Sequence, residues 1–215
     1  MVTFIREKSN SGVTVKTVGL TANPESEISV EVHEAEFVKE AEDFLRFVSD
    51  YLASSGKQIR SGETMAYGYW LVRFQAVGKR ELETWEYNAR ATDFVKGATL
   101  TLSYWRDQHL ICAQQGAVFK PPRPDKLTVI SQGVLEGLPV EGVRYPSPEH
   151  MSGWWLTTDE YDGNINSLKH QHTYHVTAAQ PHLAKYLALP EGFRFKITNG
   201  TADVWLDPKV AMAQP

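Results

Sequence analysis

The chain has 215 residues, with 22 Lys and Arg against 26 Asp and Glu, so its formal net charge is −4 at pH 7. With 42% hydrophobic and 22% charged residues, it is expected to fold around a core rather than remain disordered. The single cysteine, Cys112, excludes an intramolecular disulfide framework and a cysteine-only metal site, and it fits a reducing compartment. The excess of acidic over basic residues argues against a nucleic-acid-binding protein, because such a protein needs a clustered basic surface.

The sequence has neither a membrane-spanning nor a secretory pattern. No run approaches the roughly 18 to 20 consecutive apolar residues that cross a bilayer. Charged residues also appear among the first eight positions, before an apolar signal segment could form. We therefore expect a cytoplasmic protein that makes no membrane contact.

The first third of the chain predicts strands followed by a helix. Residues 13–20 and 28–32 are rich in valine and alternate with polar residues, which is typical of β-strands. An amphipathic helix is predicted over 37–52, because apolar residues recur every three or four positions and a serine–glycine stop signal follows. Residues 66–88 predict a β-hairpin that turns at 77–80.

Residues 92–115 combine a strand-like alternation with a helical stripe that includes Val95 and Cys112. A start signal at Asp93 and a stop signal at Gly116 favour a helix. On that stripe, Cys112 is interpreted as a small buried apolar group rather than a reactive thiolate.

Three prolines within residues 121–124 predict an extended connector. The chain is therefore divided into an N-terminal region over 1–118, a proline-rich connector over 119–126 and a second domain over 127–208. The predicted class is α+β, with two sheet-and-helix halves of mostly antiparallel strands joined by the connector. In the second domain we expect strands near 127–130, 140–145, 154–157, 193–197 and 202–206, a helical turn from Ser131, a short helix over 179–187 and a turn at Asn199-Gly200.

Three histidines, His170, His172 and His175, lie close together in the sequence. On a strand, His170 and His172 would share a face, whereas on a helix His172 and His175 would pair. Neither geometry collects three imidazoles, and no carboxylate lies nearby in sequence to support them. We therefore favour an exposed polar strand and assign no metal ligand, catalytic residue or cofactor. The chain also lacks a nucleophile elbow, a glycine-rich phosphate loop and paired zinc-binding cysteines.

Carboxylates surround an aromatic residue in Asp159-Glu160-Tyr161-Asp162. The spacing lacks the closing glutamate of a calcium loop, so the segment is interpreted as a solvated turn, with a protein-docking surface as the alternative. Trp154 and Trp155 are adjacent on a predicted strand, so one is expected in the core and the other on the opposite face. If the protein is a binder, its candidate partner-binding residues are Trp154, Trp155, Asp159, Glu160, Tyr161 and Asp162.

Residues 127–206 carry a succession of short structural motifs. They are Val129-Ile130-Ser131, Val134-Leu135-Glu136-Gly137, Pro139-Val140, Val143-Arg144-Tyr145, Ser152-Gly153-Trp154, Pro181, the helix Leu183 to Leu187, and Pro190-x-Gly192-x-x-Phe195. In these motifs the chain resembles immunity-protein family number thirty-three of bacterial polymorphic-toxin systems, formerly a domain of unknown function. The resemblance implies an α+β fold without a cofactor, encoded beside a secreted toxin, that protects the producing cell by binding that toxin.

The resemblance favours a non-catalytic immunity protein whose partner is a cognate protein toxin, neutralised by occlusion of its site. A basic toxin face, such as that of a nuclease, would suit the acidic segment 159–162. Two alternatives stay open. One is a metal-assisted hydrolase that uses His170, His172 and His175, and the other is a housekeeping module that binds a small ligand between the two halves. No sequence pattern fixes an oligomeric state.

Overall fold

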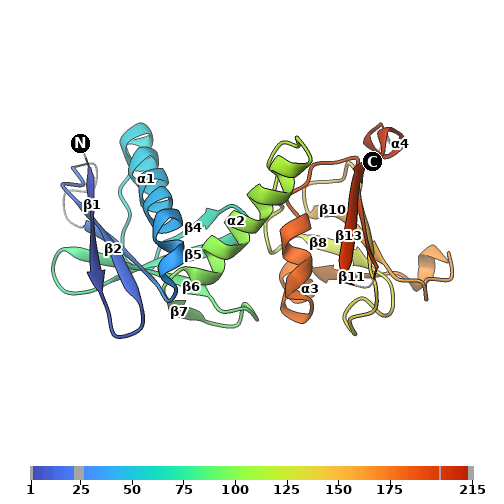
Figure 1. Ribbon diagram of the computed structural model, residues 1–215, viewed down its shortest axis with the longest axis horizontal. Helices are drawn as coiled ribbons and strands as arrows, with labels where there is room; N and C mark the ends of the chain where they lie inside the picture. Colours follow the sequence, from blue (N-terminus) through green and yellow to red (C-terminus); the bar gives the residue numbers. More distant parts are fainter. Residues whose placement is uncertain (1, 22–26, 199, 213–215) are drawn as a thin grey trace. The chain divides into compact units, whose positions relative to one another are not determined.

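The computed structural model describes residues 2–21, 27–198 and 200–212. The chain divides into two compact units: an N-terminal unit formed mostly by residues before Asp107, and a C-terminal unit formed mostly by residues from Asp107 onwards. Each unit combines one sheet with helices (Figure 1), which confirms the α+β class and the two sheets of mostly antiparallel strands. The division at residues 119–126 stays a prediction. None of the helices in the described part is long and apolar enough to cross a membrane.

The N-terminal unit is built on a mixed sheet, which has seven strands in the described residues. The strand order is β1-β2-β3-β6-β5-β4, with β7 paired to β6. The pair β3 and β6 is parallel, and the other neighbouring strands are antiparallel. The strands are β1 (Thr3–Lys8), β2 (Val13–Val18), β3 (Glu27–Val32), β4 (Thr64–Tyr67), β5 (Trp70–Ala76), β6 (Glu81–Tyr87) and β7 (Phe94–Lys96).

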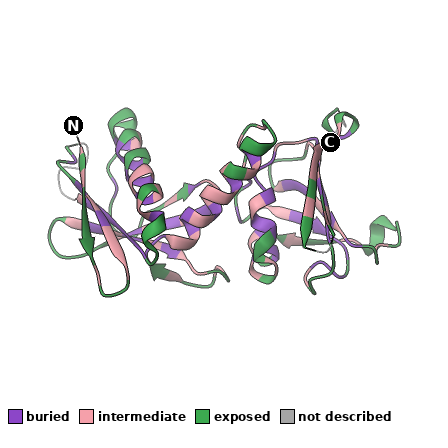
Figure 2. Cartoon of the chain, in the orientation of Figure 1, coloured by how far each residue is buried: buried purple, intermediate pink, exposed green. Residues whose placement is uncertain are grey.

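A short 3-10 helix, η1 (Ala35–Phe37), leads into α1 (Val38–Ser55), which packs on β2 and β3. The predicted apolar stripe is confirmed, and it forms the buried face of α1: Ala41, Phe44, Leu45, Val48 and Leu52. Figure 2 shows buried and exposed stretches alternating along α1. Gly56 ends α1 in the left-handed conformation, with φ at 65°, as the stop signal predicts.

Helix α2 (Thr99–Gln114) begins later than the sequence predicts. Phe94–Lys96 forms strand β7 instead, so neither Asp93 nor Val95 belongs to the helix. The backbone changes direction at Gly97, whose φ of 104° is one that other residues rarely adopt. The sequence prediction was wrong here because helical spacing does not reveal a short strand that pairs with β6.

The N-terminus of α2 is capped by a carboxylate from another element, Glu86 of β6. The backbone N–H groups of Leu100 and Thr101 donate to Glu86 at 3.0 and 2.6 Å, and the Thr101 hydroxyl donates at 2.7 Å. Burial raises the pKa of Glu86 despite these hydrogen bonds. The helix ends before Gly116 as predicted, and Cys112 is 2% exposed, which confirms that it is a buried group.

The C-terminal unit contains a second mixed sheet with the order β11-β8-β10-β9-β12-β13. The pair β8 and β10 is parallel, and the others are antiparallel. The strands are β8 (Leu127–Ile130), β9 (Glu141–Arg144), β10 (Met151–Thr157), β11 (Lys169–His172), β12 (Phe193–Thr198) and β13 (Thr201–Leu206). The helices are η2 (Ile165–Ser167), α3 (Thr173–Ala179), η3 (Pro181–Tyr186) and α4 (Pro208–Ala211).

The five strands predicted for this half are confirmed, but the helical segments differ. The segment after Ser131 forms turns rather than a helical turn, because Gly133 and Gly137 have φ values of 87° and 89° that interrupt helical geometry. The helix predicted over 179–187 is the 3-10 helix η3, and α3 precedes it unpredicted. Of the predicted turn at Asn199-Gly200, Asn199 lies outside the described residues.

We predict that Glu86→Ala lowers the free energy of unfolding by about 2 kcal/mol at pH 5, since it leaves buried N–H donors of α2 without an acceptor. A raised carboxyl pKa means that the stability contributed by Glu86 is complete below the unfolded pKa and declines as pH rises through the folded pKa. In urea denaturation, the difference in free energy of unfolding between Glu86→Ala and the wild type should therefore become smaller from pH 5 towards pH 8.

The matched control is Glu83→Ala on the same strand, since Glu83 pairs with half-exposed Lys96 at 2.6 Å. Its effect should stay below about 1 kcal/mol. Equal losses for the two variants would contradict the capping role of Glu86.

Candidate protein-binding surfaces

The C-terminal unit is organised around a buried arginine. Arg144, the last residue of β9, is 4% exposed. Its Nη1 donates to the carbonyl oxygens of Lys120 at 2.6 Å and Leu187 at 3.1 Å, and to that of Leu189. The guanidinium also lies 5.9 Å from the ring centroid of Trp154, whose indole N–H donates to the same Leu187 carbonyl at 3.0 Å. One side chain thus joins three chain segments that are distant in sequence.

The charge of Arg144 is not neutralised by contact with a carboxylate in the described residues. Burial lowers its pKa to about 10, while the charge of Glu191 opposes that shift. Glu191 is itself paired with the Lys120 ammonium at 2.7 Å. The Nε of Arg144 is buried and makes no hydrogen bond to any described residue. A buried cation held mainly by carbonyl dipoles is unusual, because an unpaired buried charge is costly.

The two adjacent tryptophans lie on opposite faces of β10, as the sequence predicts. Trp154 is fully buried and packs on Phe195 with ring centroids 5.4 Å apart. Trp155 is half-buried and meets Tyr145 edge-on at 5.8 Å. Trp154 is therefore a core residue, and of the pair only Trp155 reaches the surface.

The segment Asp159–Asp162, here called the acidic loop, is separated from the end of β10 by Thr158. The N–H of Tyr161 donates to the carbonyl of Thr158 at 3.0 Å, and the Thr158 hydroxyl donates to the carbonyl of Gln132 at 2.8 Å, so both ends of the turn are fixed. The side chains of Asp159, Glu160 and Asp162 are exposed, and Tyr161 is half-buried. None of the three carboxylates forms an ion pair with a described residue.

An apolar side chain stands next to the acidic loop. Ile165 is 63% exposed. Asp162 accepts hydrogen bonds from the Asn164 N–H at 2.8 Å and the Ser167 hydroxyl at 3.1 Å, which orders the backbone on both sides of Ile165. The sequence did not single out Ile165, although an isoleucine among Gly, Asn and Ser residues is a visible signal of an exposed apolar group.

The three histidines do not share one element. His170 and His172 lie on β11, and His175 lies on α3. The rings of His172 and His175 are 5.9 Å apart edge-on, and His172 Nδ1 is 2.7 Å from the Asp125 carbonyl oxygen. Within the described residues, no group of three or more His, Cys, Asp or Glu side chains is arranged to hold a metal ion.

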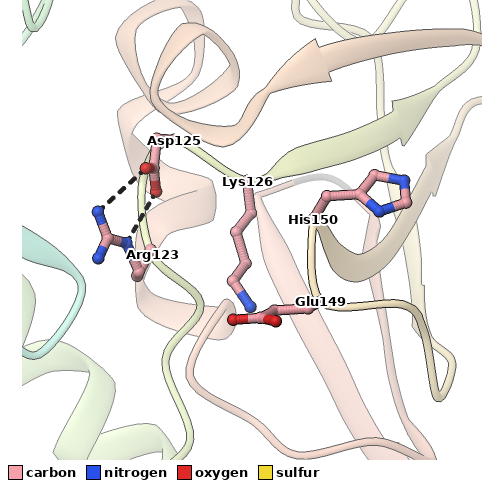
Figure 3. Close-up of a pocket in the computed structure, with 5 residues that line it drawn as sticks. All are labelled: Arg123, Asp125, Lys126, Glu149 and His150. Atoms are coloured by element: carbon pink, nitrogen blue, oxygen red, sulfur yellow. Dashed lines mark hydrogen bonds and ion pairs between the residues drawn. The ribbon is translucent and has the colours of Figure 1, made fainter.

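A second charged surface lies where β8 and β10 begin. It contains a hollow of about 560 Å³. The hollow is lined by Arg123, Asp125, Lys126, Glu149 and His150, whose side chains are drawn in Figure 3. Arg123 and Asp125 pair with each other through two contacts of 3.1 Å, at one side of the hollow. No local sequence pattern marks these residues, because the loops before β8 and before β10 are brought together by the parallel pairing of those strands.

These features define the C-terminal unit as an α+β domain with a hollow of mixed charge where its parallel strands begin and an acidic loop after the end of β10. Residues 107–207 match the family model of the Imm33-like domain. The resemblance of residues 127–206 is therefore confirmed, and the match extends upstream to Asp107. Comparison with curated proteins and with solved structures found no match.

We predict that Arg144→Met lowers the free energy of unfolding of the C-terminal unit by about 3 kcal/mol, since three buried carbonyls lose a charged donor. Denaturation followed by tryptophan fluorescence measures this loss. Arg123→Met is the control, because its side chain is 63% exposed, and it should cost less than about 1 kcal/mol. A stable Arg144→Met protein would show that the carbonyl contacts contribute little.

Proposed function

We propose that this protein is an immunity protein that binds a cognate bacterial toxin and neutralises it by covering the toxin's functional site, without catalysing a reaction. The Imm33-like domain over residues 107–207 is the observation that carries this proposal, because an immunity family implies a toxin as the partner. Such a protein would act in the cytoplasm of the cell that produces the toxin.

The acidic loop is proposed as the part of the surface that contacts the toxin. Its three exposed carboxylates lie within four residues and lack ion-pair partners among the described residues, so they project a negative field into solvent. Such a field would accelerate encounter with a basic toxin face. The rigid turn means that little conformational entropy is lost on binding.

Apolar contact would supply most of the affinity. Half-buried Tyr161 lies between the carboxylates, and exposed Ile165 follows them. Trp155 lies on the strand that leads into the loop. Aromatic and apolar anchors surrounded by a charged rim are the usual composition of an interface centre. Because Trp154 is fully buried, its proposed contribution is to support β10 rather than to contact the toxin.

The test starts from co-purification of the full chain from its native host, which identifies the polypeptide that returns at a stoichiometric ratio. The triple variant Asp159→Lys, Tyr161→Ala and Asp162→Lys should then weaken the affinity for that polypeptide at least about 100-fold, roughly 2.7 kcal/mol. It should also abolish protection of cells that express the toxin.

The control is Asp203→Lys, an exposed aspartate on the edge strand β13, which does not neighbour β10. It should leave the affinity unchanged. Wild-type affinity and protection in the triple variant would refute the acidic loop as the binding surface, while absence of any protein partner would refute the immunity function itself.

A further inference from the structure

A second hollow adjoins the one in Figure 3 and reaches the buried arginine. It has a volume of about 300 Å³ and shares Arg123, Lys126 and Glu149 with its neighbour. We call it the arginine hollow. Its charged lining residues are Lys120, Arg123, Lys126, Arg144, Glu149 and Glu191. Four cations therefore face two carboxylates in a confined space.

Only two of these four cations form ion pairs with described residues. Lys120 pairs with Glu191 at 2.7 Å, and Arg123 pairs with Asp125. Lys126 and Arg144 have no ion pair with any residue in the described ranges. In Figure 3 the Lys126 side chain extends toward the Glu149 carboxylate. An incoming anion would therefore compete with Glu149 for Lys126, but none of the carboxylates that the structure describes would compete with it for contact with Arg144.

Arg144 is the second and independent indication of a ligand. The side chain is 96% buried, its Nη1 is saturated by carbonyl groups, and its Nε has no partner among the described residues. Buried charges in proteins are normally matched by an opposite charge, and a guanidinium presents paired donors that fit the two oxygens of a carboxylate. An anion in the arginine hollow would supply the missing charge.

The remaining lining selects the kind of anion. Pro121, Pro122, Pro148 and Met151 contribute apolar walls beside the cations. Apolar walls favour a carboxylate carried on a short hydrocarbon stem over a small hydrated ion, because the stem loses contact with water on binding.

We propose that the arginine hollow is a binding site for a carboxylate group of another polypeptide, either a glutamate or aspartate side chain or a chain terminus. This site lies where β8 and β10 begin, whereas the acidic loop follows the end of β10. It is therefore a separate contact surface of opposite charge, and its existence does not depend on the acidic loop or on the identity of the toxin.

The experiment uses the full-length ¹⁵N-labelled protein and follows the arginine Nε–Hε resonances by NMR. The probes are N-acetylglutamate α-methylamide for a side-chain carboxylate, N-acetylleucine for a chain terminus, and N-acetylglutamine α-methylamide as the neutral isostere. Inorganic phosphate is the fourth probe. We expect a saturable shift of the Arg144 resonance with at least one carboxylate, in the millimolar range expected for such small ligands, and none with the glutamine isostere.

Lys126→Gln tests the site without disturbing the buried arginine, and should weaken carboxylate binding about fivefold. Lys169→Gln, an exposed lysine on β11 near the other end of β8, is the matched control and should leave binding unchanged. The proposal is overturned by equal shifts with the glutamine isostere, by binding of phosphate alone, by no response to either carboxylate, or by unchanged binding in Lys126→Gln.

Discussion

The C-terminal unit depends on one buried guanidinium. Arg144 donates to carbonyl groups of the segment before β8 and of the segment that follows η3, and so ties both to the end of β9. Trp154 packs beside it and donates to one of the same carbonyls, so the central strand β10 is joined to the arrangement. The carbonyl dipoles offset part of the cost of burying a cation without a carboxylate. Arg144 still carries a positive charge that would attract an anion into the arginine hollow.

The two ends of the parallel pair β8 and β10 differ in charge. Four cations and three carboxylates line the hollows where these strands begin, whereas the acidic loop, which follows the end of β10, carries carboxylates alone. A domain with two surface patches of different charge can contact a partner through both of them, and this raises specificity more than affinity. Such specificity would suit the immunity function proposed above.

Local patterns in the sequence predicted most of the strands, α1 and the opposite faces of Trp154 and Trp155, because periodicity reports which side of an element is buried. The start of α2 could not be predicted in this way, since its cap is Glu86, thirteen residues before Thr99. The acidic loop was located correctly as a surface turn, whereas the arginine hollow was missed. Arg144 alternates with buried Val140 and Gly142, which does signal an inward side chain, but its carbonyl partners are known only once the chain has folded.

The most direct measurement of the central claim is the exchange of arginine side-chain protons with water, followed by NMR in the full-length protein. If the Arg144 guanidinium is buried and held by three carbonyls, its Nη1 protons will exchange far more slowly than those of Arg123, whose side chain is 63% exposed. Exchange of Arg144 at the same rate as Arg123 would contradict the account, because it would mean that the guanidinium is neither enclosed nor bonded as described.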